Sequence, residues 1–544
     1  MKIPPGVSPS DFSAALTEFE NAVGKDWVFT SDEDVALYRD AYSPLWGEPD
    51  EIVASAAVAP DNVDEVQKVV KIANHYRIPI YPVSTGKNLG YGGSAPNYSG
   101  SVVLYLKRMN RILEVSEANA YALLEPGVSY FDLYRYIQEK GLKLWIDCPD
   151  PGWGSPIGNA LDHGVGYTTA RYRNHFDSHC GMEVVLASGE VIRTGMGAFP
   201  KAETWQQYKF GVGPWIDGIF SQSNFGVVTK MGLWLLPSPE SYHSGTVTVP
   251  HYKDLIPLVQ IVNYLENSGT TNGMPGFGSP LFFRGGFTGR GFPKPDPEIV
   301  EMFSKDGGPS PEEVDRYAEG KGIHCWSATL GFYGGAQVNA ACWEFAKEKL
   351  SAIPGAKFAE GDTYKLPLAP EQMTMFDLPR FGIPSLQRFT IGARSETNPN
   401  PTNGHIWFSP IIPRTGEAIF EINRVLRPAF RELGLPSLSL FSLPAGYFER
   451  AFIFTFGFPI THDIEENKKM RASFKRVVQI AAEHGWGEYR TPPVFQDTVV
   501  NTYSYNNHAL LRFNETLKDA VDPNGILSAG RYGIWPKHLR ERKA

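Results

Sequence analysis

Several hallmarks of secreted, metal-binding and membrane proteins are missing from this sequence of 544 residues. It has only four cysteines, widely spaced and without a C-x-x-C pair, which excludes a sequence-visible zinc site and suits a reducing compartment. It has no basic run, and no apolar stretch approaches the roughly 20 residues needed to span a bilayer. With a formal net charge of −8, neither a nucleic acid nor a membrane is an expected partner.

Targeting signals and the common nucleotide motifs are missing as well. The first residues, MKIPPGVSPSDF, lack the apolar core of a secretory signal, and the last, LRERKA, are not a Ser-Lys-Leu peroxisomal address. We therefore predict a cytoplasmic protein. No G-x-G-x-x-G and no G-x-x-x-x-G-K-[ST] occurs, which excludes a Rossmann dinucleotide site and a P-loop.

Glycine-rich loops, in contrast, are frequent in the first half. The segment PVSTGKNLGYGG (82–93) directly follows an apolar run, and its small residues allow backbone N–H groups to turn toward an anion. A single loop of this kind could equally be a flexible surface segment. Four further glycine-rich pieces favour a phosphate-binding site instead: EPGV (125–128), GWGSPIGN (152–159), GVGY (164–167) and GVV (226–228).

The order of helical and strand patterns divides the chain. The first part is predicted to contain a helix at 62–75, strands at 78–83, 101–106 and 121–124, and a hairpin at 182–193. After LLPSPE (235–240), helices at 253–266 and 342–350 alternate with loops, the Gly/Pro-rich stretch 273–311 is expected to cover the surface, and a helix follows at 467–484. These changes place domain boundaries near 241 and near 487.

Longer strings resemble the vanillyl-alcohol oxidase family of FAD-dependent 4-phenol oxidases. They include PVSTGKNLGYGGSAP, YALLEPGVSYFDLY, GNALDHGVGYT, GPWIDGIFSQSNFGVVTKMG, GHIWFSP, WGEYRT and VDPNGILSAGRYGIWP, and the resemblance is thinnest between about 270 and 400. It implies an α+β, two-domain FAD-linked oxidase fold. Residues 1–241 plus 487–544 would form the FAD-binding domain, 242–486 would form a central α/β cap (substrate) domain, and the protein would be at least a homodimer.

The resemblance also implies which residues hold FAD. The expected contacts are Ser84, Thr85, Gly86, Lys87, Asn88, Leu89, Gly90, Pro126, Gly127, Gly154, Ser155, Gly158, Asn159, Gly226, Val228 and Arg531. His405 matches the histidine that binds the flavin 8α-methyl covalently, although a strand histidine taken alone is more often structural. A tyrosine used for attachment elsewhere in the family corresponds to Gly392, so that alternative is absent.

Three residues match the family's phenol-binding trio: Tyr91, Tyr489 and Arg490. A free phenol has a pKa of about 10, so binding it as phenolate at neutral pH requires concentrated positive charge. Arg490 stays ionised and two tyrosine hydroxyls can donate to the same oxygen. The adjacent pair Tyr489-Arg490 is weak evidence alone, because neighbours in a strand point to opposite faces.

Asp150 matches the family's aspartate near the reactive flavin nitrogen, where a carboxylate could act as a base toward water. A turn-forming role is the commoner one for Asp-Pro-Gly, and Asp147 is the rival carboxylate. In the β-pattern of GHIWFSP, Trp407 shares a face with His405, which predicts a narrowed substrate pocket and a preference for small para-alkyl or para-hydroxymethyl phenols.

The implied function is oxidation of para-substituted phenols (4-hydroxybenzylic alcohols, 4-alkyl- or 4-allylphenols). Hydride would pass from the benzylic carbon to FAD with formation of a quinone methide, and dioxygen would reoxidise the flavin to give hydrogen peroxide. A dehydrogenase that passes electrons to a cytochrome or another acceptor is the main alternative. A flavin-bound protein without catalysis and a sugar or lactone oxidase are further ones.

Three segments depart from the family pattern. Thr169–His175 is two residues longer and more basic than usual, and Gly446–Arg450 replaces a segment that commonly contains two histidines. In Tyr42–Glu51 there is no counterpart of a histidine that assists flavin attachment. Substrate identity and flavin attachment are the properties that these changes put in question.

Overall fold

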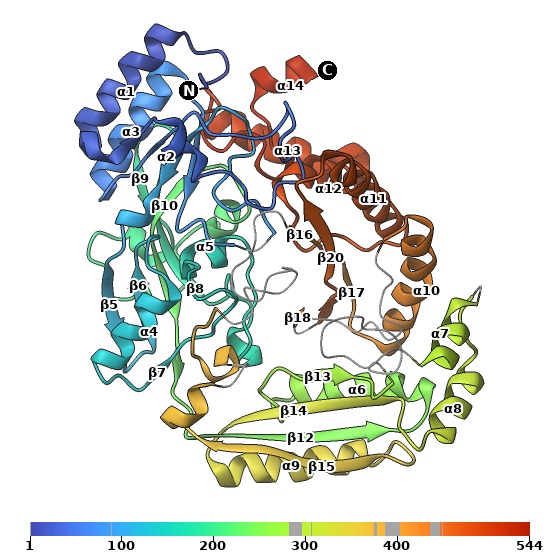
Figure 1. Ribbon diagram of the computed structural model, residues 1–544. Coiled ribbons are helices and arrows are strands. Elements are labelled where there is room, and N and C mark those ends of the chain that lie inside the picture. The colour runs from blue at the N-terminus through green and yellow to red at the C-terminus, as the bar shows by residue number, and fades with distance from the viewer. Residues whose placement is uncertain are drawn as a thin grey trace.

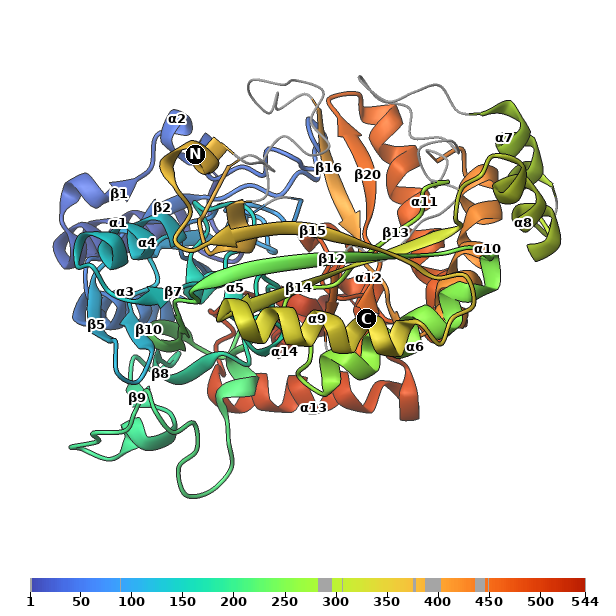
Figure 2. The same ribbon diagram turned by 90° about the horizontal axis from the view of Figure 1, so that it is seen from below.

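The computed structural model describes residues 2–88, 90–281, 296–305, 307–374, 378–386, 403–435, 446–448 and 450–543. The N-terminal and C-terminal segments lie together, and the central segments form a second body beside them (Figure 1). Figure 2, in which the molecule is seen from below, shows the long strands of the central body running across the middle of the view. The mixture of helices and sheets confirms the α+β fold class.

Two sheets form the N-terminal half. The first has the order β1-β2-β4-β3 and the second β5-β6-β10-β8-β9. Their strands are β1 (Val28–Phe29), β2 (Ala56–Val58), β3 (Ile80–Val83), β4 (Val102–Tyr105), β5 (Ile112–Ser116), β6 (Tyr121–Leu124), β8 (His179–Val185), β9 (Val191–Arg193) and β10 (Val227–Trp234). The accompanying helices are α1 (Pro9–Val23), α2 (Asp32–Ala36), α3 (Val63–Tyr76), α4 (Tyr130–Glu139) and α5 (Pro156–Leu161), while β7 (Leu144–Trp145) pairs with β11 (Leu236–Pro237).

Helix α3 shows how local sequence determines the first sheet. The side chain of Asn62 accepts a hydrogen bond from the Glu65 N–H at 3.0 Å, which caps the helix at the predicted position. Val66, Val69 and Val70 are buried against the sheet. The chain then enters β3, which pairs in parallel with β4 and ends directly before the glycine-rich loop. The predicted order of helix, strand and loop is therefore confirmed.

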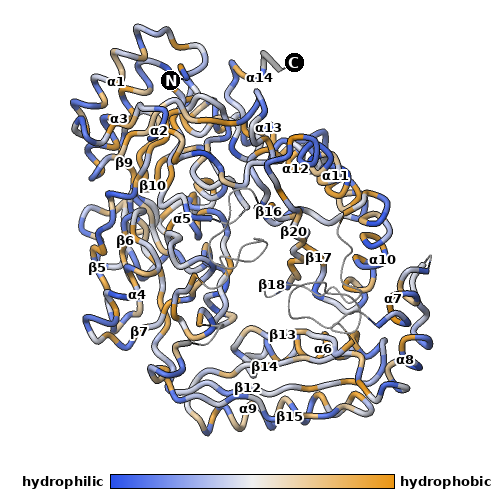
Figure 3. Tube along the Cα trace, in the orientation of Figure 1, coloured by the Kyte–Doolittle hydropathy of each residue, from blue (hydrophilic) through white to orange (hydrophobic). Residues whose placement is uncertain are grey.

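The central body is built on a sheet of order β13-β14-β12-β15, with further short strands nearby. The strands are β12 (Ser241–Val249), β13 (Gly276–Gly278), β14 (Trp326–Gly334), β15 (Lys357–Lys365), β16 (Asn403–Phe408), β17 (Ile411–Pro413), β18 (Gly446–Phe448), β19 (Ala451–Ile453) and β20 (Phe456–Thr461). The helices are α6 (Leu255–Asn267), α7 (Pro297–Ser304), α8 (Pro311–Gly320), α9 (Ala336–Leu350), α10 (Gly416–Glu432) and α11 (Ile464–Glu483). In Figure 3, hydrophilic and hydrophobic segments alternate along helices such as α11.

The stretch 273–311 is only partly a surface segment, contrary to the prediction. Gly276–Gly278 forms β13 and pairs with β14, and the side chains of Ile299 and Phe303 in α7 are buried. At Gly273, a Cβ atom would lie only 2.8 Å from the carbonyl oxygen of Gly331 in β14. Glycine there permits close approach of two backbones, a role that composition does not distinguish from a loop.

The C-terminal segment returns to the first sheet. It contains α12 (Gln496–Val500), α13 (Tyr505–Val521) and α14 (Lys537–Lys543). The N–H of Ile80 in β3 donates to the carbonyl of Ile526 at 2.7 Å, and the N–H of Ser528 donates back to Ile80 at 2.8 Å. Ile526 and Leu527 belong to the same buried cluster as β3. Both ends of the chain therefore build the region around the glycine-rich loop.

The division into domains remains a proposal. β12 begins at Ser241, where the first boundary was placed. Near the second boundary, Phe495 and Val499 pack into the hydrophobic core of the central body although they follow residue 487. Among the described helices, none combines the length and the apolar character that a membrane crossing demands.

Candidate active site

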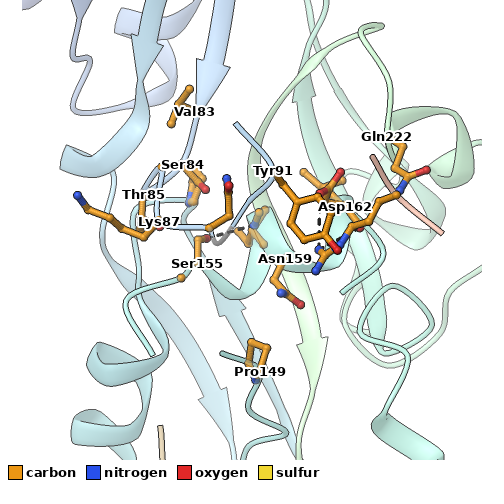
Figure 4. Close-up of a pocket in the computed structure, with 18 of the residues that line it drawn as sticks. Val83, Ser84, Thr85, Lys87, Tyr91, Pro149, Ser155, Asn159, Asp162 and Gln222 are labelled. Atoms are coloured by element: carbon orange, nitrogen blue, oxygen red, sulfur yellow. Dashed lines mark hydrogen bonds and ion pairs between the residues drawn. The ribbon is translucent and has the colours of Figure 1, made fainter. Parts of the chain in front are cut away.

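A cavity of about 560 Å³ lies where the N-terminal half, the central body and the C-terminal segment meet. The loop after β3 and helix α5 supply its polar wall. Met274, Trp407, Ile453 and Thr455 enter from the central body. In Figure 4, Thr85 and Lys87 lie at one end of the view, and Tyr91 and Asp162 lie toward the other.

Most of the residues predicted from the sequence meet at this cavity. Those that line it are Ser84, Thr85, Gly86, Lys87, Asn88, Tyr91, Pro126, Asp150, Gly154, Ser155, Gly158, Asn159, Gly226, Val228, Trp407, Tyr489, Arg490 and Arg531. Gly90, Gly127 and His405 are not in the wall itself. Leu89 and Gly392 lie outside the described residues, as does Glu449 within the segment 446–450.

The glycines of the wall allow close backbone approach. Gly90 has a φ of +71°, and a Cβ atom there would lie 2.8 Å from the carbonyl oxygen of His405. At Gly158 in α5, a Cβ atom would lie 2.4 Å from the Ser84 hydroxyl oxygen. Any side chain at either position would force apart the glycine-rich loop and the segment facing it.

The cavity fits a dinucleotide with a flat ring system. Left-handed glycines such as Gly86 (φ +64°) and Gly90 orient the backbone of the loop in the manner of a nest, which suits a pyrophosphate. Apolar side chains of Val83, Ile157 and Val228 lie in the same wall and suit a ring system.

Tyr91, Tyr489 and Arg490 come together in one wall. The guanidinium carbon of Arg490 lies 4.2 Å from the centre of the Tyr91 ring and 5.0 Å from that of Tyr489. Among the described residues, Nε of Arg490 is buried without a hydrogen-bond partner. The Tyr489 hydroxyl donates to the carbonyl of His163, just after α5.

Tyr489 and Arg490 can share a wall because they do not lie in a regular strand. Glu488 forms an isolated bridge with Pro410, and the chain then bends at Tyr489. Adjacent side chains point to opposite faces only in a regular strand, so this rule does not apply to Tyr489 and Arg490.

Burial keeps the tyrosines of this wall neutral. It raises the pKa of Tyr91, although the charge of Arg490 and hydrogen bonds from Ser409 and Arg490 oppose the shift. It also raises the pKa of Tyr489 well above its usual value, again against the influence of Arg490. Both hydroxyls thus keep their proton at neutral pH, next to a permanent cation, although the Tyr489 proton is engaged with the His163 carbonyl in this structure.

The two candidate aspartates have different surroundings. The Oδ1 atom of Asp147 accepts from the Thr168 N–H at 2.8 Å, and its Oδ2 atom lies 3.0 Å from Nε2 of His175. Asp147 is thus enclosed in a buried polar network outside the cavity wall. Asp150 lines the cavity, which favours it over Asp147 as the carboxylate that meets a substrate.

The extended basic segment 169–175 joins the two bodies. The N–H of Ala170 donates to the carbonyl of Asn272 at 2.9 Å. Arg173, only 1% exposed, places Nη2 2.8 Å from Oε1 of Glu266 in α6. This departure from the family pattern therefore contributes contacts with the central body.

His405 lies directly behind the cavity. Its ring centre is 4.3 Å from that of Trp407, which lines the wall, and 5.3 Å from that of Tyr42. Burial lowers the pKa of His405 to about 4, so the imidazole is neutral at physiological pH. Among the described residues, neither ring nitrogen has a hydrogen-bond partner. Tyr42 thus stands in the segment where the assisting histidine of the family is missing.

The sequence interpretation missed Asp162, although it quoted the string GNALDHG that contains this residue. Asp162 lines the cavity between Arg490 and Arg531. Its role depends on contacts with residues more than 300 positions away, for which the sequence has no local pattern. Gln222, at the opposite edge of the close-up in Figure 4 from Lys87, was also missed.

Comparisons with known proteins agree with this geometry. Residues 54–195 match the FAD binding domain family. The chain is 31% identical over 539 residues to the 4-cresol dehydrogenase [hydroxylating] flavoprotein subunit of Pseudomonas putida, covering 98% of this chain and 97% of that protein. The structure of 4-ethylphenol oxidase from Gulosibacter chungangensis matches with a TM-score of 0.79 and 34% identity over 99% of this chain and 100% of the other. That of p-cresol methylhydroxylase matches with a TM-score of 0.79 and 30% identity, covering 98% and 99%.

The fold and the match to an FAD-binding domain define an FAD-dependent oxidoreductase, which confirms the predicted cofactor. Sequence identity above 30% over nearly the whole chain shows the family: the chain belongs to the vanillyl-alcohol oxidase family.

Proposed function

We propose that this protein oxidises para-substituted phenols at the benzylic carbon and passes the electrons to dioxygen. The observation that carries the proposal is the buried guanidinium of Arg490 between the rings of Tyr91 and Tyr489, in a cavity that also contains the predicted FAD-binding residues. The solved relatives named for 4-ethylphenol and p-cresol support this substrate class.

The trio would hold the substrate as phenolate. Arg490 supplies a charge that persists at any physiological pH, and its unpartnered Nε adds a buried donor. Tyr91 can donate to the substrate oxygen because its own pKa is raised, and Tyr489, whose pKa is also raised, would do so once its hydroxyl turns from the His163 carbonyl to the substrate. Holding the oxygen as phenolate raises electron density at the para carbon, which makes a benzylic hydride easier to remove and leaves the substrate as a quinone methide.

FAD, when bound, supplies the acceptor for that hydride. Asp150, in the same cavity wall, would accept a proton from water that adds to the quinone methide. With a 4-hydroxybenzylic alcohol, a hydroxyl is already present and the product is an aldehyde. Residues of both bodies enclose the cavity, which limits the access of bulk water.

An anaerobic titration tests the function. Adding 4-ethylphenol or vanillyl alcohol to the FAD-loaded protein without oxygen should bleach the flavin absorbance, whereas the 4-methoxy analogue, which cannot ionise, should not. Bleaching by both compounds, or by neither, would refute the phenolate mechanism. Peroxide released on admitting air identifies dioxygen as the acceptor, and reoxidation only with a cytochrome or dye identifies the dehydrogenase alternative.

Asp150→Asn is expected to lower kcat by about a hundredfold, the lower end of what a general base contributes. The change removes the basic oxygen and keeps the shape. Asp147→Asn is the contrasting variant: it weakens the buried network with Thr168 and His175 and should lower Tm. Steady-state turnover of 4-ethylphenol and thermal melting of both variants measure this, and a normal kcat in Asp150→Asn would assign the base elsewhere.

Trp407→Ala is expected to shift preference toward larger phenols. The indole occupies the cavity wall beside His405, so its removal leaves space next to the substrate. The ratio of kcat/KM for a 4-hydroxybiaryl alcohol to that for vanillyl alcohol should rise by about tenfold, as expected when a few buried methylene equivalents no longer clash. An unchanged ratio, or a wild-type enzyme already faster on the biaryl, would show that Trp407 does not limit substrate size.

Covalent attachment of FAD through His405 is part of the proposal. A neutral, buried imidazole whose nitrogens make no other described hydrogen bond retains a lone pair for bond formation. Gly90 in the glycine-rich loop touches the His405 backbone, so the residue lies next to the predicted cofactor site.

We also propose a cytoplasmic homodimer or higher homo-oligomer. Exposed apolar side chains on the C-terminal helix α13, Leu510 and Phe513 at 60% each, support an association surface there. Size-exclusion chromatography with light scattering measures the assembly.

A further inference from the structure

Asp162 lies between two arginines of the cavity, Arg490 and Arg531, and its carboxylate is closer to Arg531. Its Oδ1 atom accepts from Nη2 of Arg531 at 2.8 Å and from the Tyr532 hydroxyl at 2.8 Å. Its Oδ2 atom lies 3.6 Å from Nη1 of Arg490, beyond good hydrogen-bond distance. The carboxylate of Asp162 therefore forms its close ion pair with Arg531 and not with Arg490.

Arg531 is held in that position from a second side. Its Nη1 atom donates to the Tyr81 hydroxyl at 3.0 Å, and Tyr81 belongs to β3. The side chains of Arg531 and Asp162 are 18% and 20% exposed, so solvent screens the pair weakly. The side chain of Arg490 is also 18% exposed.

Burial favours the neutral form of six other titratable groups around these three residues. Burial raises the pKa of each neighbouring tyrosine and of the Glu488 carboxyl behind Tyr91, and it lowers the pKa of His163. The groups concerned are Tyr81, Tyr91, Tyr489, Tyr532, Glu488 and His163. The ion-paired charges are thus two guanidinium groups and the Asp162 carboxylate, while the Asp150 carboxyl lies elsewhere in the same cavity wall.

We propose that Arg531, by neutralising Asp162, sets the charge of the phenol pocket and leaves the cation of Arg490 available to the substrate oxygen. This rests on the proposed function, because it concerns how the pocket stabilises a phenolate. It assigns Arg531 and Asp162 as positioning and charge-setting residues, a role distinct from the contact with FAD expected of Arg531. Without Arg531, the negative charge of Asp162 would be paired only with Arg490. Arg490 would then stabilise a bound phenolate less.

Binding of 4-nitrophenol to the FAD-loaded enzyme tests this directly. The probe has no benzylic carbon, so it is not oxidised, and its phenol and phenolate forms absorb at different wavelengths. Difference spectra across a pH series give the ratio of the two bound forms, with each sample normalised to its flavin content. The measurement does not depend on turnover.

Three variants are expected to change the ratio of bound phenolate to phenol in different directions. Arg531→Gln should lower the ratio of bound phenolate to phenol by about tenfold at fixed pH, the effect of a nearby carboxylate losing its counter-ion. Asp162→Asn should raise it by about the same factor. The double variant should return close to wild type, because both the charge and its counter-charge are gone. Damage to the fold alone would move all three in one direction.

Arg531→Lys is the matched control. It keeps the positive charge beside Asp162 and should retain most of the bound phenolate, so the comparison of Gln with Lys stands even if Asp162→Asn does not fold. Equal ratios in Arg531→Gln and wild type would overturn the inference and leave the phenolate mechanism intact. A wild-type enzyme that binds 4-nitrophenol only as the neutral phenol would overturn both.

Discussion

Arg490→Met is expected to lower kcat/KM for 4-ethylphenol by about a thousandfold, the upper range for loss of one buried group that stabilises developing or bound negative charge. Methionine fills a similar volume without charge or donors. Tyr91 and Tyr489 would remain, but two neutral hydroxyls stabilise an anion much less than a guanidinium does. The phenol would then bind mainly in its neutral form, and the push of electrons toward the para carbon would be lost.

Rate measurements across pH separate this effect from a general loss of structure. In Arg490→Met, activity should recover at alkaline pH, where the free substrate is itself ionised, and Arg490→Lys should be intermediate because it keeps the charge without the planar donor geometry. Arg171→Gln, which removes an exposed arginine at the start of the extended segment, is the control and should behave as wild type. A methionine variant within tenfold of wild type at neutral pH would mean that another group holds the phenolate.

His405→Ala is expected to abolish covalent flavin retention. Acid precipitation of wild-type protein should leave the yellow colour in the pellet, whereas the variant should release it into the supernatant. The ring of His405 lies close to the loop at Gly90, where a Cβ atom would be 3.3 Å from its Cδ2 atom. FAD should still bind, since the contacts of the cavity wall are unchanged, and turnover should fall because a flavin without the 8α-histidyl bond is a weaker oxidant.

Two comparisons make this result interpretable. His484→Ala removes a surface histidine of the α11 C-terminus and should keep its colour in the pellet. Colour released from wild-type protein would refute the histidyl bond while leaving the FAD site in place. In that case the segment around Tyr42, whose ring centre lies 5.3 Å from that of His405, would be the one that fails to assist attachment.

The sequence predicted well those features that depend on neighbours along the chain. Helix α3, strand β3 and the glycine-rich loop follow from local periodicity and turn chemistry, and the residues singled out at Tyr489 and Arg490 lie in the cavity wall. The different surroundings of Asp147 and Asp150 could not be read in this way. They depend on His175 and Thr168, which reach Asp147 only after the chain has folded.

Long-range geometry also explains the features that were missed or misjudged. Asp162 acquires its partners from Arg490 and Arg531, far away in sequence, and no spacing rule connects them. The bend at Tyr489 places two adjacent side chains in one wall, whereas a strand pattern separates them. Gly273 resembles a loop residue in composition but serves the contact with β14.

The pairing of Ile526 and Ser528 with Ile80 has a consequence for biosynthesis. Ser84 and Arg531 line one cavity, yet the ribosome makes Arg531 several hundred residues after Ser84. The glycine-rich loop therefore emerges long before the segment 526–528 and the arginine that complete its surroundings. Capture of FAD in its final position must follow translation of the C-terminal segment, and a nascent chain stalled before residue 526 should bind the cofactor poorly.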